Sequence, residues 1–134
     1  MSARPYASSP RRTILIVEDD LETRLFYSDA LSRGGFRIDQ AHNGHQALEK
    51  ALHSVPDLIF TDIALPGMDG IELCRRLRAD ERTRDIPLLA ITGYGDRHYP
   101  DRARLAGADH VLIKPCDAES IVTEARRLLA PPQA

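Results

Sequence analysis

Polar residues follow four short apolar runs of this sequence, at the point where each run ends. They are two adjacent acids, a third acid, a hydroxyl and an amine: Glu18, Asp19, Asp62, Thr92 and Lys114. In an open parallel sheet, ligands bind in the crevice beyond the carboxyl ends of the strands. If the four runs are strands of one sheet, these side chains converge on one place. Such a set can bind a divalent cation and a phosphoryl group together.

The three acids are candidate ligands for Mg²⁺. Glu18 and Asp19 are adjacent carboxylates that repel each other, so holding them together costs stability unless a cation binds. Mg²⁺ prefers octahedral oxygen ligands, keeps several waters and is usually held by one or two carboxylates and a phosphate. Glu18, Asp19 and Asp62 suit that role. The alternative is that residues 18–20 only form a solvated helix start that complements the helix dipole, which is what we expect of Asp20.

Asp62 is also a candidate nucleophile, because it ends an apolar run and precedes a Pro-Gly loop. A carboxylate can attack phosphorus and form an aspartyl phosphate. The alternative is an aspartate that only caps a helix or a turn. Thr92 could donate a hydrogen bond to a phosphoryl oxygen, although a threonine at a strand end often reflects only β propensity.

Lys114 is the candidate cation for the phosphoryl oxygens. Only Lys50 and Lys114 are lysines among the 18 basic residues, and Lys114 closes an apolar run in a chain that otherwise uses arginine. A compact ammonium fits a small site where a planar guanidinium would not; the alternative is chance. The Lys114-Pro115 step favours a cis peptide bond, which would turn the chain and aim the ammonium inward.

Apolar periodicity predicts strands and helices that alternate along the chain. The predicted strands cover residues 13–18, 36–41, 57–61, 86–91 and 109–113. The predicted helices cover residues 20–33, begin at Asn43-Gly44 and at Ile71, and cover residues 96–106 and 118–129. The first helix carries apolar residues near helical spacing, at Leu21, Leu25, Phe26 and Leu31. Asp69 is a candidate N-cap for the third helix.

Five alternating strand–helix units require right-handed crossovers and a parallel sheet that helices cover on both faces. We expect residues 1–12, rich in serine, proline and arginine, to form a flexible tail. Residues 13–130 are expected to form one domain, and residues 131–134 a short C-terminal tail.

The composition favours a soluble cytoplasmic protein. The 134 residues suffice for one domain with its own core, and the net charge of -2 gives no reason to expect nucleic acid or a membrane surface as partner. No apolar run approaches the ~20 residues of a membrane span, and the N-terminus lacks the apolar stretch of a signal peptide. Cys74 and Cys116 form no spacing motif, so reduced thiols in the cytoplasm are expected.

Four stretches together resemble the receiver domain of bacterial two-component response regulators, the CheY-like superfamily. They are residues 14–20 (ILIVEDD), 62–70 (DIALPGMDG), 91–93 (ITG) and 113–115 (IKP). The resemblance covers about residues 13–130, nearly the whole chain. It implies a flavodoxin-like, doubly wound α/β fold: (βα)5 with a five-stranded parallel sheet in strand order 2-1-3-4-5.

The resemblance also implies a role for each site residue. Asp62 matches the phosphoacceptor, which would take a phosphoryl group from a histidine kinase or a histidine phosphotransfer protein. The acidic pair matches the residues that organise Mg²⁺, for which Mn²⁺ could substitute, and Ala64 matches the position whose backbone carbonyl binds the metal. Thr92 matches the switch hydroxyl, and Lys114 matches the lysine that contacts the phosphate.

One position departs from the family pattern. The family often has tyrosine or phenylalanine three residues before the lysine, and this chain has Val111 there. Tyr94 either replaces that aromatic or covers the pocket. Phosphorylation is expected to move a face formed by the predicted elements 96–106, 109–113 and 118–129, with an unknown output protein as partner. That face would present Tyr94, Tyr99, Arg102, His110 and Val111.

The sequence leaves three alternatives to a stand-alone signalling receiver. A degenerate receiver would act as a scaffold without phosphorylation, although the site is complete. An aspartate-nucleophile phosphatase would need an acid two residues after Asp62, where this chain has Ala64. A flavodoxin would bind a phosphate at the first strand end, where Glu18 and Asp19 would repel it. We therefore expect no turnover enzyme, and we expect output through a partner unless the chain is part of a longer regulator or hybrid kinase.

Overall fold

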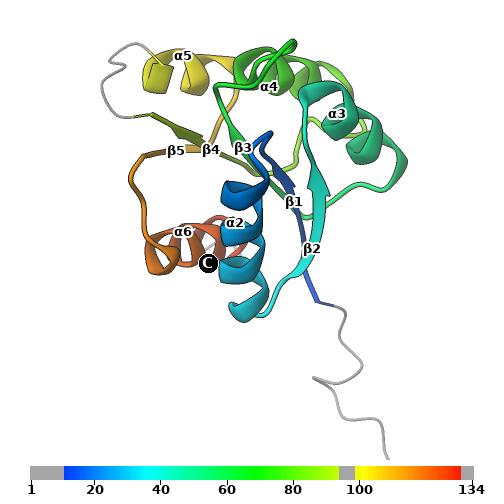
Figure 1. Cartoon of the computed structure of the whole chain (residues 1–134). Helices are drawn as coiled ribbons and strands as arrows, with labels where there is room; N and C mark the ends of the chain where they lie inside the picture. The colour runs from blue at the N-terminus through cyan, green and yellow to red at the C-terminus, as the bar shows by residue number, and fades with distance from the viewer. Residues whose placement is uncertain (1–10, 94–98, 131–134) are drawn as a thin grey trace, which may run out of the picture.

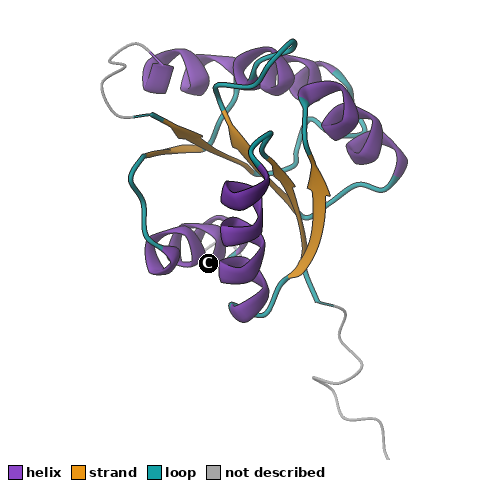
Figure 2. Ribbon diagram, viewed as in Figure 1, coloured by secondary structure: helices purple, strands orange, loops and turns teal. Residues whose placement is uncertain are grey.

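The structure, a computed structural model, describes residues 11–93 and 99–130. The strands are β1 Thr13–Val17, β2 Arg37–Ala41, β3 Leu58–Asp62, β4 Leu88–Thr92 and β5 His110–Ile113. The helices are α2 Leu21–Arg33, α3 Gly44–His53, α4 Gly70–Ala79, α5 Tyr99–Ala106 and α6 Ala118–Leu129. Figure 2 shows that the helices lie on both sides of the strands, as the alternating pattern predicts.

The strands form one parallel sheet in the order β2-β1-β3-β4-β5. Helices α3, α4 and α5 cover one face of this sheet, and α2 and α6 cover the other (Figure 1). In register, Val17 lies opposite Thr61, and Thr92 lies opposite Ile113. The predicted flavodoxin-like fold is therefore confirmed, and four neighbouring strands end at the same edge.

Two apolar clusters, one on each face of the sheet, form the core. Alternate residues of β1 point to opposite faces: Leu15 and Val17 belong to the cluster under α3, α4 and α5, while Ile14 and Ile16 belong to the cluster under α2 and α6. Each such side chain contributes about 1.5–3 kcal/mol when it is fully buried. Because β1 lies inside the sheet, both of its faces are covered, and its last four residues, 14–17, are apolar and buried.

Side-chain caps fix where four helices begin. Asp20, Asn43, Asp69 and Asp117 each accept a hydrogen bond from the backbone N–H three residues later. This satisfies donors that have no partner within the helix. The expectations that Asp20 starts a helix and that Asp69 caps one are confirmed. Helix α2 ends at Gly34, and Gly35 follows with a φ of 99°, a conformation that favours glycine.

The face that α2 turns to the core differs from the expected one. Of its four apolar positions only Leu31 is buried, whereas Leu21, Leu25 and Phe26 are about half exposed. At 3.6 residues per turn, the spacing of six positions from Leu25 to Leu31 places the two on different sides of the helix. The residues of α2 that are buried are Tyr27, Ala30 and Leu31.

The element boundaries shift by a few residues. β4 begins at Leu88, two residues later than predicted, and Pro87 before it has no N–H for the ladder. α5 begins at Tyr99, and the predicted start of this helix and the loop residue Tyr94 fall outside the described residues. Among the described residues, no helix is both long and apolar enough to cross a membrane.

Arg78 ties together the edge of the sheet opposite the site. Its guanidinium donates to the carbonyls of Arg84 and Ile86, each at 2.6 Å, and to that of Gly107 at 2.8 Å. It also pairs with the Asp109 carboxylate at 2.9 Å, which accepts from the N–H of Leu88. One side chain therefore joins α4 to the starts of β4 and β5.

We expect Arg78→Met to lower the free energy of unfolding by about 2–4 kcal/mol, because it leaves several half-buried acceptors without a donor. Urea unfolding followed by far-UV circular dichroism measures this. Arg75→Met is the matched control, since its exposed guanidinium pairs only with Glu72 at 3.5 Å, and it should cost less than about 1 kcal/mol. Equal losses would show that Arg78 is an ordinary surface residue.

Candidate functional site

The edge where four strands end brings three predicted site residues together. Glu18 follows β1, Asp62 closes β3 and Lys114 follows β5. The Lys114 ammonium lies 2.5 Å from Asp62 Oδ2 and 3.9 Å from Glu18 Oε1. The two carboxylates are almost fully buried, while the Lys114 side chain keeps about a third of its surface exposed. An ion pair of this kind is held together far more strongly than one on the surface.

Backbone geometry fixes the Asp62 carboxylate. Its Oδ1 accepts a hydrogen bond of 2.8 Å from the N–H of Ala64. This is the contact expected of an aspartate that caps a turn. The other oxygen, Oδ2, faces Lys114. Gly70 packs against the same backbone, and a Cβ at that position would lie 2.4 Å from the Asp62 carbonyl oxygen. Asp62 thus caps a turn and also belongs to the charge cluster, which consists of Glu18, Asp62 and Lys114. Each of its two carboxylate oxygens has a different partner.

Glu18 is the most perturbed acid of the site. Its Oε2 accepts from the N–H of Asp20 at 3.0 Å, whereas its Oε1 is buried and makes no hydrogen bond with any described residue. Burial, followed by the neighbouring Asp62, raises the pKa of Glu18 to about 8, and Lys114 opposes that rise only in part. A buried oxygen without a donor is a place where a cation or a water can bind.

Lys114 is held by its backbone as well as by its charge. Its N–H donates to the carbonyl of Thr92 at 2.8 Å, and the predicted cis peptide bond to Pro115 is present. Partial burial lowers the pKa of Lys114, but the hydrogen bond and the charge of Asp62 outweigh this and leave the pKa raised. The ammonium is therefore charged at neutral pH.

The other predicted residues lie around this cluster. Thr92 is buried at the end of β4, while Asp19 and Ala64 are exposed. No three acidic, histidine or cysteine side chains within residues 11–93 and 99–130 stand together in an arrangement that would hold a metal. The donors nevertheless fit Mg²⁺, which needs only one or two carboxylates and keeps its waters. Glu18 Oε1, which accepts no hydrogen bond from a described residue, lies at the end of β1 with the exposed Asp19, and the exposed Ala64 follows the adjacent strand β3.

The predicted output face needs one correction. Val111 is only 5% exposed and belongs to the core cluster with Ala103 and Ala106 of α5, so it is not a surface residue. The alternation of β5 turns Val111 toward α5 and its neighbours away from it. His110 instead faces α6, where its Nε2 lies 3.6 Å from Glu124 Oε1. Tyr94 and the Tyr99 side chain lie outside the described part of the structure.

Sequence comparison identifies the family to which this fold and this site belong. The family model "Response regulator receiver domain" matches residues 14–126. The chain belongs to the response regulator receiver family. This receiver is 40% identical over 116 residues to the DNA-binding dual master transcriptional regulator RpaA of Synechocystis sp., a match that covers 87% of this chain and 48% of that protein. The receiver thus spans about half the length of that relative.

Solved structures show the same fold. The chemotaxis response regulator CheY4 of Vibrio cholerae superposes with a TM-score of 0.84 at 27% identity, covering 90% of this chain and all of that one. The signal receiver domain of a signal transduction histidine kinase from Syntrophus aciditrophicus superposes with a TM-score of 0.83 at 33% identity, covering 89% and 90%. Domains of this family therefore occur both in response regulators and in a histidine kinase.

Beside the charge cluster, the receiver has a groove of about 680 Å³ that sequence analysis missed. It runs between the start of α2 and the segment that links β5 to α6. Its lining combines acidic, aromatic and small side chains with the site lysine: Asp20, Glu22, Thr23, Phe26, Tyr27, Gly93, Lys114, Pro115 and Cys116. The two walls are distant in sequence, so only the fold shows that they face each other.

Tyr27 is the unusual member of this groove. It is only 3% exposed, and its ring packs edge-on against Phe60 with 4.8 Å between ring centroids. Burial, and then the charges of Glu18 and Asp62, raise the pKa of Tyr27 above its ordinary value. The Phe26-Tyr27 pair, adjacent aromatics that cannot both face the core, was the one signal in the sequence that could have revealed it.

Glu18→Gln should change how the stability of this receiver depends on pH in EDTA. The pKa of Glu18 is about 8 in the folded protein against an ordinary 4.5, so the unfolded chain releases its proton first. Wild-type stability should therefore fall as pH rises from about 5 to 8, by more than about 1 kcal/mol. Gln does not titrate, so the variant should be the more stable protein at pH 8.

Urea unfolding at pH 5 and pH 8 tests this. Glu49→Gln is the control, because Glu49 is exposed on α3 and its exchange removes the same charge. If Glu18→Gln and the wild type lost stability in parallel between the two pH values, Glu18 would not be a buried proton carrier.

Proposed function

We propose that this receiver accepts a phosphoryl group on Asp62 from a phosphohistidine of a histidine kinase or a histidine phosphotransfer protein. The observation that carries the proposal is the state of the Asp62 carboxylate. One oxygen is fixed by the Ala64 N–H and the other faces the Lys114 ammonium at 2.5 Å, at the carboxyl edge of a parallel sheet. Transfer of a phosphoryl group requires this combination of a fixed nucleophile and a nearby cation.

Asp62, Lys114 and Thr92 have different roles in the proposed transfer. An Asp62 oxygen forms a bond to phosphorus while the phosphorus–nitrogen bond of the donor breaks, and its electron pair stays on the ring nitrogen. Lys114 already contacts the Asp62 carboxylate. After transfer its ammonium neutralises the phosphoryl oxygens, which take the place of that carboxylate as its partner. Thr92, buried at the next strand end, is placed to offer its hydroxyl to one of those oxygens.

Mg²⁺ is the proposed cofactor, and Mn²⁺ should substitute for it. When bound, the ion neutralises charge on the phosphoryl group. Glu18, Asp19, Asp62 and the backbone carbonyl of Ala64 would hold it. Support comes from Oε1 of Glu18, which accepts no hydrogen bond from a described residue, and from the exposure of Asp19 and Ala64 next to the buried carboxylates.

We assign a signalling role rather than turnover of an external substrate. A phosphatase that uses an aspartate nucleophile needs an acid near the leaving group, and Ala64 supplies none at the predicted position. A scaffold without phosphorylation would not need a buried acid whose oxygen lacks a donor, because such a group costs stability. The reduced cysteines Cys74 and Cys116 fit a cytoplasmic location.

The output face proposed for the phosphorylated state consists of α5, β5 and α6. Lys114 follows β5 directly and is hydrogen-bonded to Thr92, so a phosphoryl group that draws on both acts on that edge of the sheet. The partner is an unidentified protein. Binding of this chain itself to nucleic acid is not proposed, since its net charge is -2.

We expect acetyl phosphate to label the protein with one phosphoryl group only when Mg²⁺ or Mn²⁺ is present, and Asp62→Asn to abolish labelling, because an amide is a poor nucleophile. Intact mass spectrometry measures this. Asp57→Asn is the matched control, since Asp57 is an exposed acid on the opposite edge of the sheet. Labelled Asp62→Asn would remove Asp62 as the acceptor.

Asp19→Asn should weaken Mg²⁺ binding by about tenfold or more, since it removes a charged ligand. Lys114→Met should not weaken it, because the ammonium competes with the metal for the same carboxylates. Titration of amide NMR shifts with Mg²⁺ gives both affinities. Equal weakening in the two variants would contradict the division between metal ligands and phosphate ligand.

A further inference from the structure

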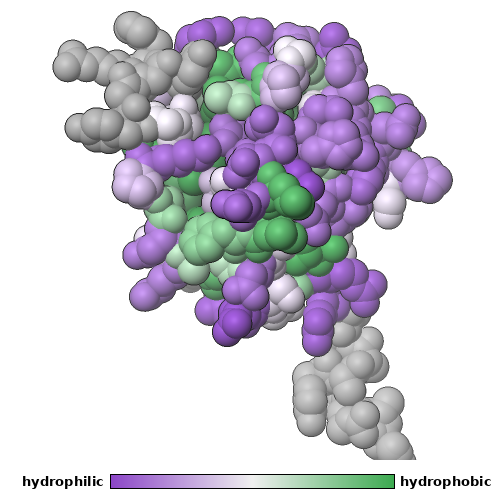
Figure 3. Space-filling view, in the orientation of Figure 1, coloured by the Kyte–Doolittle hydropathy of each residue, from purple (hydrophilic) through white to green (hydrophobic). Residues whose placement is uncertain are grey.

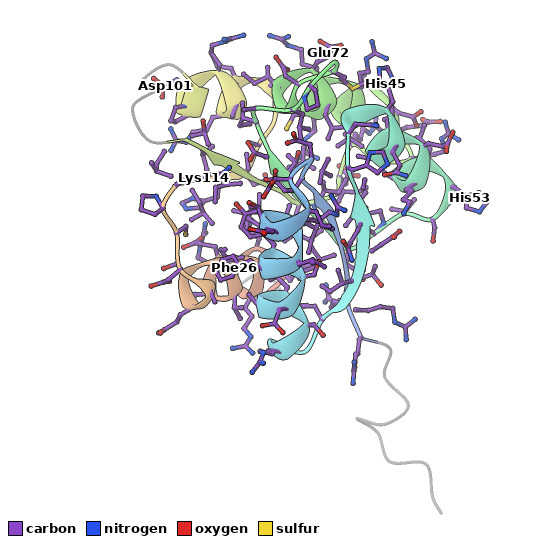
Figure 4. All side chains as sticks on the ribbon, viewed as in Figure 1. Phe26, His45, His53, Glu72, Asp101 and Lys114 are labelled. Atoms are coloured by element: carbon purple, nitrogen blue, oxygen red, sulfur yellow. The ribbon has the colours of Figure 1, made fainter. Side chains whose placement is uncertain are left out.

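The groove beside Asp62 has two chemically different parts. Its wall on α2 is aromatic, with Phe26 46% exposed and Tyr27 behind it, while exposed Asp20 and Glu22 form an acidic rim. Figure 4 shows Phe26 on α2, on the side of the molecule where Lys114 also lies. Figure 3 shows apolar surface over the same region of α2 and α6. The volume of about 680 Å³ is that of a site for a small ligand or a side chain.

The hydroxyl of Tyr27 has an unused hydrogen-bonding capacity. It makes no hydrogen bond with any described residue, although the residue is 97% buried, and its oxygen is not among the fully buried unpaired atoms. The hydroxyl therefore reaches the groove. Buried polar groups normally have a partner, so a hydroxyl that opens into a groove is free to take its partner from a molecule bound there.

We propose that Tyr27 is a positioning residue for the phosphodonor, whose imidazole ring lies in this groove against Phe26 and the Tyr27 hydroxyl. The inference rests on the proposed transfer to Asp62. Its support is complementarity: a ring protonated on its second nitrogen is a cation with an N–H donor. The acidic rim attracts the charge, the face of Phe26 binds it, and the Tyr27 oxygen accepts the hydrogen bond.

The position of the groove suits the step itself. One of its lining residues is Lys114, whose ammonium touches Asp62. As Asp62 bonds to phosphorus, the phosphorus–nitrogen bond breaks and its electron pair returns to the ring. The ring leaves as neutral imidazole because its second nitrogen already carries a proton. A neutral phenol that accepts this N–H keeps the proton on the ring, which makes the ring a better leaving group.

Two small donors separate this role from the rest of the site. N-phosphoimidazole carries the ring, whereas acetyl phosphate carries none, and both deliver the same phosphoryl group to Asp62. We therefore compare the ratio of their rate constants, phosphoimidazole over acetyl phosphate, in saturating Mg²⁺. Tyr27→Phe should lower this ratio about five- to tenfold, the effect of one hydrogen bond. Phe26→Leu, which removes the aromatic face, should lower it as well.

Ser28→Ala is the matched control. Ser28 lies next to Tyr27 on the same helix, and its hydroxyl is likewise without a hydrogen bond, but it does not line the groove. Ser28→Ala should leave the ratio of the two rate constants unchanged. If the loss of a hydroxyl from α2 acted only through the fold, Tyr27→Phe and Ser28→Ala would change this ratio to the same extent. An unchanged ratio in Tyr27→Phe overturns this inference alone. Failure of acetyl phosphate to label the wild type at Asp62 overturns the proposed function, and this inference with it.

Discussion

The contact between the Lys114 ammonium and the Asp62 carboxylate is the interaction on which the site depends. Asp62 closes the fully buried strand β3 and is almost fully withdrawn from water, whereas Lys114 follows the edge strand β5 and keeps about a third of its side chain exposed. The Asp62 charge would not be tolerated there alone, because a buried charge without a partner costs on the order of several kcal/mol. A group that replaces one partner of the pair must therefore carry the same charge. A phosphoryl group meets this condition, because it can replace the Asp62 carboxylate as the anionic partner of Lys114.

The sheet makes this pairing possible, and the rest of the fold protects it. Parallel register brings Glu18, Asp62 and Lys114 to one edge, while the two apolar clusters hold the strands that carry them. Gly70 lets α4 approach the Asp62 backbone closely. At the opposite edge, Arg78 ties α4 to the starts of β4 and β5, so α5 is anchored at its end distant from the site.

The sequence predicted the order of elements and the strand-end residues well, because continuous apolar runs and capping residues such as Asp20 and Asp69 are strong local signals. It failed where a residue's surroundings come from distant segments. Val111 looked like a surface residue of an edge strand, yet α5 covers it. Leu25, Phe26 and Leu31 were expected on one apolar face of the first helix, yet of these only Leu31 is buried. The groove exists because α2 faces the Pro115-Cys116 segment, which no local pattern records.

Reduction of the labelled protein with borohydride tests the central claim, that the carboxylate paired with Lys114 is the phosphoacceptor, most directly. Borohydride converts an aspartyl phosphate into homoserine and leaves free aspartate unchanged, so tandem mass spectrometry of peptides reads the modified residue. The account predicts homoserine at position 62 only, in protein labelled in the presence of Mg²⁺. Homoserine at Asp19 or at any other acid, with Asp62 intact, would contradict it.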